Sequence, residues 1–467
     1  MQRRAQWTLL LATSAVSFMS TIDASIVNIA IPHISRELRV PMNQAEWVVS
    51  VYLVLICALL ILFGKLSDQV GRIPIFQIGT LVFVTGSLGC GLATSLPILL
   101  MTRALQALGA AMTMSTNFGI ITQIFDRSEH GKALGINSAF VQVGNIAGPG
   151  LGGLMLAVAN WHWIFFVNIP IGLIAFLFGR KQFPSSQLNW SKVDIDWTGY
   201  ATFSTMIIAF FVAIYWGQGV GFDHLGVISL LVLALVLGVI FVRVEQRVAT
   251  PLIDLHIFHN QAFSIGITTA MLVYMVGYFN NVIMPFYLQE TLGLSAALAG
   301  IILMAVPVLN IISAPTGGVI GDHIGAERIS FYALFIFLIP EIIFILVQPS
   351  WSILWLVLGL ASYGIANGLF QNNPMIMGNA GQAFQGVAGS IAALARNLGM
   401  TIGLSLATSL LYFRISQEAG RRTTTYPAAH PAWFVSGMHF TYAFALGLIV
   451  IALGLLGWLL TRRRHHA

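Results

Sequence analysis

The sequence predicts an all-α integral membrane protein with fourteen transmembrane helices, on the basis of its composition and its long apolar stretches. Of 467 residues, 57% are hydrophobic and 8% are charged, whereas soluble proteins carry about 25% charged residues. A hydrocarbon core about 30 Å thick needs about 20 apolar residues per helix. The qualifying stretches are 7–30, 43–63, 74–94, 97–120, 132–157, 162–180, 197–216, 224–243, 263–285, 297–319, 330–347, 351–372, 386–412 and 436–460. The alternating apolar pattern of a membrane β-barrel is absent.

The distribution of basic residues predicts how these spans are oriented. With the N-terminus in the cytoplasm, fifteen Lys and Arg residues lie on the inner side. Five lie on the outer side: Arg36, Arg39, Arg414, Arg421 and Arg422. Cytoplasmic loops are enriched in basic residues, so both termini are expected in the cytoplasm. The basic residues behind the net charge of +6 are therefore explained as determinants of membrane orientation. The sequence contains no stripe of basic residues that would indicate nucleic-acid binding.

The fifth predicted span contains a long glycine run. It reads G-x8-G-x3-G-P-x2-G-G, with Gly135, Gly144, Gly148, Pro149, Gly152 and Gly153. Lipid gives helices no hydrophobic reason to associate, so small residues at membrane interfaces let backbones approach closely. A proline removes one helix hydrogen bond and bends the segment. We interpret the run as a surface against which another helix slides; the alternative is an ordinary close-packing stripe.

A repeated loop indicates two related halves. The pattern G-x3-D-x2-G occurs at residues 64–71, after the second span, and at 318–325, after the tenth. Each copy follows the second helix of a six-helix set, and many transporters are built from such repeats. We expect an N-terminal six-helix bundle at 1–181, a linker with two extra transmembrane helices at 182–260, and a C-terminal six-helix bundle at 261–467.

Several motifs together resemble the fourteen-helix drug:proton antiporter branch of the major facilitator superfamily. They include I-D-A-S-I-V-N-I-A-I-P at 22–32, R-A-L-Q-A-L-G-A-A at 103–111, the glycine–proline run, W-H-W-I-F-F-V-N-I-P at 161–170 and R-N-L-G at 396–399. Ala107 stands where that family usually has glycine. The resemblance implies the major facilitator fold, in which two six-helix bundles with a pseudo-twofold repeat are joined by two inserted helices.

Asp23 and Arg103 are charged residues inside predicted spans, at similar depths from the outer surface. A charge at the bilayer centre costs about 2.5–3.5 kcal/mol on insertion scales, so it usually faces protein or water. In the fold that the resemblance implies, their helices line one cavity. We expect protonation of Asp23 to free Arg103 and so to couple protons to transport. The alternatives are a static pair and two residues that never meet.

Two further ionisable residues lie within spans. Arg396 lies about ten residues into the thirteenth span, near the midplane. It is either a substrate-side or gating arginine or one bound by carbonyls of a neighbouring helix. Glu341 follows Pro340 in the eleventh span, where burial can keep a carboxyl protonated. A structural hydrogen bond is the favoured interpretation of Glu341, and a transport role is the alternative.

The predicted substrate cavity is lined by polar and aromatic residues, because adaptable sites combine aromatic area with a few hydrogen-bonding groups. The candidates are Gln106, Phe140, Gln142, Asn145, Tyr274, Tyr278, Asn281, Asn367, Phe370, Arg396 and Asn397. Each is also compatible with ordinary helix packing. The resemblance further implies a cytoplasmic gate, formed by Gly64, Asp68, Gly71, Arg72 and Asp322; the alternative is a helix cap with topology charges.

Other chemistries have no support in the sequence. The phosphate-binding pattern G-x4-G-K-[S/T] is missing, as are the metalloprotease pattern H-E-x-x-H and the nucleophile elbow. Cys57 and Cys90 lie within spans and cannot form a usual zinc site. We therefore expect no cofactor, no metal site and no enzymatic activity.

The predicted function is proton-coupled export of amphipathic drug-like compounds across the bacterial cytoplasmic membrane by alternating access. The same fold could instead export a dedicated lipid, siderophore or metabolite, with drug resistance incidental. A non-transporting membrane sensor is a remote alternative. The expected partners are a small amphipathic substrate, protons and membrane lipid, with a periplasmic adaptor as a further option. We expect a monomer.

Overall fold

The computed structural model describes residues 3–126, 129–182, 196–248, 251–253, 255–379, 385–423 and 425–464. Within these ranges the secondary structure is helical, with no β-strand. Every predicted span coincides with a helix. Thirteen helical segments of the described residues are long and apolar enough to cross a membrane. The fifth predicted span is also a helix, α6 (His130–Val158). The predicted all-α membrane fold is thus confirmed.

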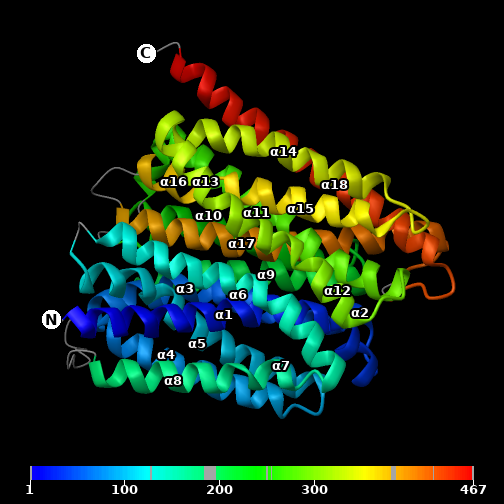
Figure 1. Cartoon of the computed structure of the whole chain (residues 1–467), viewed down its shortest axis with the longest axis horizontal. Helices are drawn as coiled ribbons and strands as arrows, with labels where there is room; N and C mark the ends of the chain where they lie inside the picture. The colour runs from blue at the N-terminus through cyan, green and yellow to red at the C-terminus, as the bar shows by residue number, and fades with distance from the viewer. Residues whose placement is uncertain are drawn as a thin grey trace. The chain divides into compact units, whose positions relative to one another are not determined.

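The chain divides into two compact units (Figure 1). The first comprises Met1–Val40, Gln44–Gly148 and Val158–Leu255, and the second comprises Pro41–Asn43, Pro149–Ala157 and His256–Ala467. Helices α6 and α2 (Met42–Ala45) therefore contribute to both units. The two extra spans group with the first unit. The three-part domain division stays a prediction.

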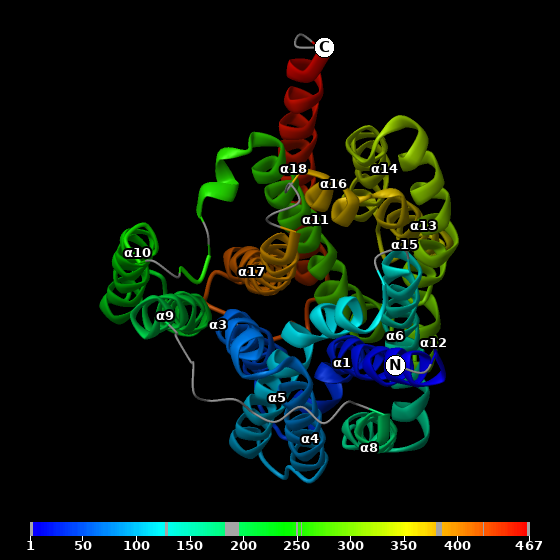
Figure 2. The same cartoon turned by 90° about the vertical axis from the view of Figure 1, so that its left-hand side faces the viewer.

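The helices of the first unit pack side by side and are seen nearly end-on in Figure 2. They are α1 (Arg3–Glu37), α3 (Trp47–Val70), α4 (Arg72–Gly91), α5 (Leu96–Ile124), α7 (Trp163–Phe166), α8 (Asn168–Gln182), α9 (Trp197–Val220) and α10 (Leu225–Glu245). Helix α5 packs against α3 and α4, α1 packs against α8, and the α9–α10 pair contacts α3 through α9.

Two glycines allow α4 and α5 to approach closely. A Cβ added at Gly86 would lie 2.6 Å from the backbone nitrogen of Gln106, and a Cβ at Gly109 would meet the backbone of Phe83. Only glycine permits such an approach without a shift of one helix. The contact places Gln106 and Arg103, on the same helix, against the interior of the unit.

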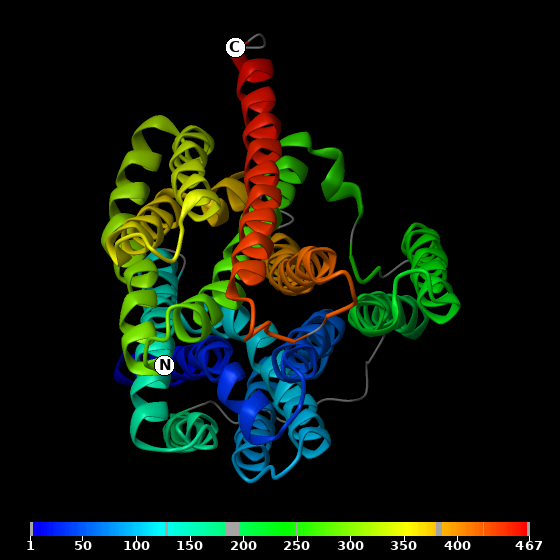
Figure 3. The ribbon, with the colours of Figure 1, turned by 90° about the vertical axis from the view of Figure 1, so that its right-hand side faces the viewer.

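The helices from η2 to α18 are shown in green to red in Figure 3. They are η2 (Leu255–His259), α11 (Gln261–Phe286), η3 (Tyr287–Thr291), α12 (Ala296–Leu303), α13 (Ala305–Ile324), α14 (Ala326–Leu346), α15 (Ile353–Leu369), α16 (Asn372–Asn379), α17 (Gln385–Ala419) and α18 (Pro431–Arg464). Leu255 itself is assigned to the first unit. Helix α11 packs against α17 and α18, α13 packs against α15, and α14 packs against both α15 and α18.

The repeated loop has the same backbone geometry in both units. Gly71 lies between α3 and α4 with φ +122°, and Gly325 lies between α13 and α14 with φ +95°. Each donates its N–H to the carbonyl four residues earlier, Ser67 or Gly321 respectively. Positive φ at this position favours glycine because it carries no Cβ. The repeat read from the sequence thus corresponds to a repeated turn.

The α4–α5 contact gives a stability prediction. Gly86→Ala places a methyl group 2.6 Å from the Gln106 backbone, and such overpacking typically costs about 1–3 kcal/mol. We expect a lower thermal unfolding midpoint in detergent. Gly447→Ala on α18 is the control, because no atom lies within 4 Å of the added Cβ. Equal midpoints for the two variants would contradict the close contact.

Candidate functional site

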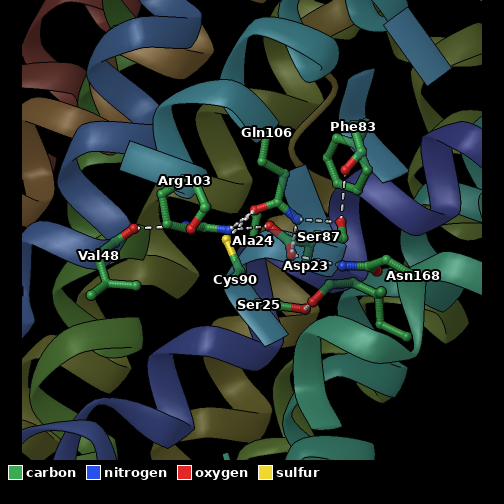
Figure 4. Close-up of polar contacts among 12 residues, drawn as sticks. Asp23, Ala24, Ser25, Val48, Phe83, Ser87, Cys90, Arg103, Gln106 and Asn168 are labelled. Atoms are coloured by element: carbon green, nitrogen blue, oxygen red, sulfur yellow. Dashed lines mark hydrogen bonds and ion pairs between the residues drawn. The ribbon is translucent and has the colours of Figure 1, made fainter. Parts of the chain in front are cut away.

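The interior of the first unit contains a buried ion pair. The Nη1 of Arg103, on α5, lies 2.6 Å from the Oδ2 of Asp23, on α1. Both side chains are 0% exposed, and Figure 4 shows the contact between Arg103 and Asp23 as a dashed line. The two charges that the sequence places at similar depth are therefore in direct contact. Breaking such a buried pair by removing one partner leaves an uncompensated charge.

The Asp23 carboxyl accepts hydrogen bonds from three different side chains. Besides Arg103, the Nε2 of Gln106 donates to Oδ1 at 2.9 Å and the Nδ2 of Asn168 donates to Oδ1 at 2.8 Å. An ionised carboxylate can only accept, whereas a protonated one must also donate. Since all three partners donate N–H groups, the surroundings fit the ionised form of Asp23.

Arg103 is held by contacts that do not involve Asp23. Its Nε donates to the Val48 carbonyl at 2.8 Å. Its guanidinium carbon lies 4.2 Å from the centre of the Tyr52 ring and 5.6 Å from that of Phe165, within the range of cation–π attraction. Its Nη2 has no hydrogen-bond partner among the described residues. The guanidinium is therefore held through Nε and Nη1, and Nη2 is its unsatisfied donor within the described ranges.

Gln106 joins the ion pair to α4. Its Oε1 accepts from Arg103 Nη1 at 2.5 Å, and its Nε2 also donates to the Ser87 hydroxyl at 2.7 Å. The Cys90 thiol lies 3.8 Å from the same Oε1. The sequence proposes Gln106 for the substrate cavity, whereas the structure places its amide, fully buried, inside the ion-pair network.

The sequence does not single out four groups of this network. They are the Asn168 amide, the Ser87 hydroxyl, the Val48 carbonyl and the Tyr52 ring. Asn168 does lie in a family-like run, at 161–170. The polarity of these groups within apolar stretches is the available signal, but their helical phase relative to Asp23 is not visible in the sequence.

The other cavity candidates are distributed over both units. Tyr278, Phe370 and Asn397 are buried, Phe140, Tyr274, Asn367 and Arg396 are half-buried, and Asn281 is exposed. Tyr274 accepts a hydrogen bond from Asn372 at 2.6 Å, and Asn397 donates to the Ala393 carbonyl at 2.8 Å. The side chains of Gln142 and Asn145 lie outside the described residues. A cavity lined by both units stays a prediction.

The first repeated loop contains a local ion pair. The Nε of Arg72 lies 2.7 Å from the Oδ1 of Asp68, and its Nη1 donates to the Gly119 carbonyl at 3.0 Å. These bonds connect the end of α3 to α5 within the first unit. Gly64 lies on α3, and Asp322 is exposed on α13. The gating role of these residues stays a prediction.

The glycine run brings α6 close to α1, the helix that carries Asp23. A Cβ on Gly144 would lie 2.9 Å from the Phe18 carbonyl oxygen, and one on Gly148 would meet the Ser25 side chain. Within the second unit, a Cβ on Gly153 would lie 2.5 Å from the Ala296 carbonyl oxygen. Gly152 is buried, and the surroundings of Gly135 and Pro149 are outside the described part. These contacts agree with a close-packing surface; sliding stays a prediction.

The chain matches a known protein family over most of its length. The model of the Major Facilitator Superfamily matches residues 13–404 and 268–467. The chain belongs to the Major Facilitator Superfamily. It is therefore a multi-pass membrane transporter, and the buried ion-pair network of the first unit is its candidate site.

Individual members of the superfamily are similar over most of the chain. The riboflavin transporter RibZ of Clostridioides difficile is 32% identical, with 87% of this chain and 88% of that protein covered. The multidrug resistance protein Stp of Mycobacterium tuberculosis is 30% identical, with 87% and 76% covered. The tetracenomycin C resistance and export protein of Streptomyces glaucescens is 26% identical, with 88% and 77% covered.

A solved structure supports the same fold. It is a bacterial homologue of the human lysosomal transporter Spinster, in an inward-facing and unoccupied conformation. The TM-score is 0.64, the identity is 15%, and the alignment covers 98% of this chain and 97% of that one. At this identity the likeness concerns the major facilitator fold alone.

A double-mutant cycle tests the ion pair. Arg103→Met and Asp23→Asn each leave one buried charge without its partner, which costs about 3–5 kcal/mol in comparable cases. We expect both single variants to unfold at lower temperature in detergent. The double variant removes both charges and should recover part of the loss, as measured by its unfolding midpoint. Strictly additive effects would show that the two side chains do not interact.

Proposed function

We propose that this transporter is a proton-coupled exporter of small amphipathic compounds, with Asp23 as the coupling acid. The observation that carries the proposal is the buried carboxylate of Asp23, which is balanced by Arg103 and by two amide donors. Only a proton can remove its charge without moving a helix. The site is thus suited to report protonation as a change of internal charge balance.

Protonation would rearrange the network in a defined way. When the Asp23 carboxylate takes a proton, it gains a donor and attracts the Arg103 guanidinium less strongly. Arg103 keeps its bonds to the Val48 carbonyl and the Gln106 amide, but it becomes a buried cation without a counter-ion. A conformation that solvates the guanidinium is then favoured, because an unpaired buried charge is costly.

This change would reach the helix packing through α1. Asp23 lies on α1, whose Phe18 and Ser25 contact the glycines of α6 closely. Gly144 and Gly148 have no side chains of their own at this contact, and small residues of this kind let membrane helices approach closely. We propose that proton binding shifts the equilibrium between outward-open and inward-open forms, as alternating access requires.

The proton gradient supplies enough energy for such export. One charge that crosses 100 mV is worth about 2.3 kcal/mol. Each 1.4 kcal/mol corresponds to a factor of about ten, so one proton can support roughly a fiftyfold cargo gradient. A pH gradient adds to this value.

Two classes of cargo have support. Relatives named for multidrug resistance and for tetracenomycin C export favour amphipathic drug-like compounds. The riboflavin transporter, at 32% identity, favours the second candidate, a dedicated metabolite. The half-buried Arg396 and the small number of acidic residues in the spans make a neutral or anionic cargo chemically suitable.

The remaining assignments belong to the same proposal. We place the protein in the bacterial cytoplasmic membrane with both termini inside, because the basic residues then lie on the cytoplasmic side. We assign it to the fourteen-helix drug:proton branch and treat it as a monomer in contact with lipid, to which a periplasmic adaptor could bind. The Asp68–Arg72 loop serves as part of a cytoplasmic gate.

Reconstituted vesicles test the coupling. Riboflavin and tetracenomycin C, the compounds named for two of the relatives, serve as probes of the two cargo classes, with and without an imposed pH gradient. We expect gradient-dependent flux of at least one probe by the wild type and its loss in Asp23→Asn. Glu418→Gln is the control, because Glu418 lies in a partly exposed pair with Arg414. Flux that ignores the gradient would refute antiport, and a fully coupled Asp23→Asn variant would exclude Asp23 as the coupling acid.

The gate makes a separate prediction. The Asp68 and Arg72 side chains are 58% and 34% exposed, and exposed pairs contribute about 0–1 kcal/mol to stability. We therefore expect Asp68→Asn to keep the wild-type unfolding midpoint while its transport rate falls about tenfold or more, equivalent to about 1.4 kcal/mol of barrier. An unchanged rate would mean that the pair only caps a helix and helps to set the orientation of the protein in the membrane.

A further inference from the structure

A second buried acid lies in the second unit, remote in sequence from the Asp23 network. Glu341 on α14 is 0% exposed, and neither of its carboxyl oxygens has a hydrogen-bond partner among the described residues. A buried polar group without a partner is unfavourable, and a buried unpaired charge is far more so. The structural hydrogen bond favoured from the sequence is thus not found for Glu341 within the described residues, and its surroundings need another explanation.

The face of α14 that carries Glu341 is aromatic. Phe337 and Phe344 lie four residues before and three residues after it, and so on the same side of the helix. The Phe337 ring is 5.1 Å from Tyr363 on α15, and the Phe344 ring is 4.9 Å from Tyr442 on α18. Both phenol groups interact electrostatically with the Glu341 carboxyl. The acid thus lies near one tyrosine of α15 and one of α18.

The hydroxyl groups of these tyrosines reach α11. Tyr442 donates to the Asn280 Oδ1 at 2.8 Å. A Cβ on Gly277 would lie 2.5 Å from the Tyr363 hydroxyl, so the missing side chain provides room for this group. Gly277 and Asn280 are three residues apart and share one face of α11. A polar array therefore runs through the apolar second unit from Glu341, through the tyrosines, to the first long helix of that unit.

The array contains no positive charge to balance a carboxylate. Helices α13, α15, α16 and α18 contact α14. The titratable groups that face Glu341 from them are Tyr363 and Tyr442, and no cationic side chain of the described residues acts on it. The Nδ2 of Asn280 is also buried and has no partner within the described ranges. The site therefore accommodates a neutral carboxylic acid and excludes a carboxylate.

We propose that Glu341, with Tyr363, Tyr442 and Asn280, forms a second proton-binding site of this transporter. The carboxylate takes a proton from hydronium and releases water when the array is open to solvent, and it holds that proton when the array is closed, as here. The inference rests on the proposed proton coupling, because a second titrating acid has a transport role only if protons move. The competing interpretation is a permanently protonated acid.

The two acids would respond to a proton in opposite ways. Protonation of Asp23 leaves Arg103 without its counter-ion and destabilises the closed network. Protonation of Glu341 removes an unpaired charge from an aromatic interior and stabilises the closed array. Proton binding could therefore open one unit's core while it closes the other's.

Infrared spectroscopy tests the site without any cargo. The wild type in lipid should show the carbonyl band of a protonated carboxyl, which shifts in D2O and disappears reversibly at alkaline pH. Glu341→Gln should lose this band, whereas Asp23→Asn and Glu418→Gln should keep it. Absence of a Glu341-dependent band would overturn the proposal. A band that neither exchanges nor titrates would also overturn it, because the proton would then be permanent.

A second variant tests the site if Glu341→Gln fails to fold. Glu341→Met is apolar and similar in volume, and replacing a buried unpaired polar group by an apolar one can be neutral or stabilising. We expect a wild-type or higher unfolding midpoint, no carboxyl band and about a tenfold lower gradient-driven flux of the transported probe. If Glu341→Met transports the probe and protons at the wild-type rates, Glu341 has no transport role. If the wild-type protein transports the probe independently of the gradient but still shows a carboxyl band that titrates, the proposed coupling is refuted while the proton-binding site at Glu341 is kept.

Discussion

The arrangement of the first unit depends on the cost of keeping charge away from water. Moving an ion into a protein interior costs several kcal/mol even after relaxation, and Asp23 and Arg103 share this cost by direct contact. The contact requires that Asp23 on α1 and Arg103 on α5 lie at the same level along the two helices. The Gly86 and Gly109 contacts bring α4 close enough for Ser87 to bond Gln106, and Asn168 connects the pair to α8. One electrostatic requirement therefore constrains four helices.

Asp23 and Glu341 lie in different surroundings. The first surrounds Asp23 with N–H donors and a cation, so that the ionised form is stable there. The second surrounds Glu341 with phenylalanine and tyrosine rings, so that the ionised form is unstable. The two acids thus have opposite preferences for a proton, although they lie in units with a common repeated turn. Side-chain chemistry has diverged where backbone geometry has not.

Much of the fold follows from the sequence, because apolar length and glycine spacing act locally along a helix. The predicted spans match helices, although α1 and α18 extend well beyond the predicted 7–30 and 436–460. Their polar ends continue the helix past the hydrocarbon core, where hydropathy gives no signal. The Asp23–Arg103 contact could also be expected from their similar depth. The partners Asn168 and Ser87 could not, because their approach depends on how α8 and α4 are rotated about their axes. The same limit applies to Glu341, whose neighbours Tyr363 and Tyr442 come from distant segments.

The matching turns at Gly71 and Gly325 have a consequence for how the two halves can vary. A left-handed residue at this point sets the direction in which the following helix departs, whatever side chains surround it. The side chains at the neighbouring positions can then differ between the two loops. In the aligned repeats, Lys65 and Arg72 of the first loop correspond to Val319 and Ala326 of the second. A loop with basic residues at these two positions and a loop with apolar residues there can in this way share one bend.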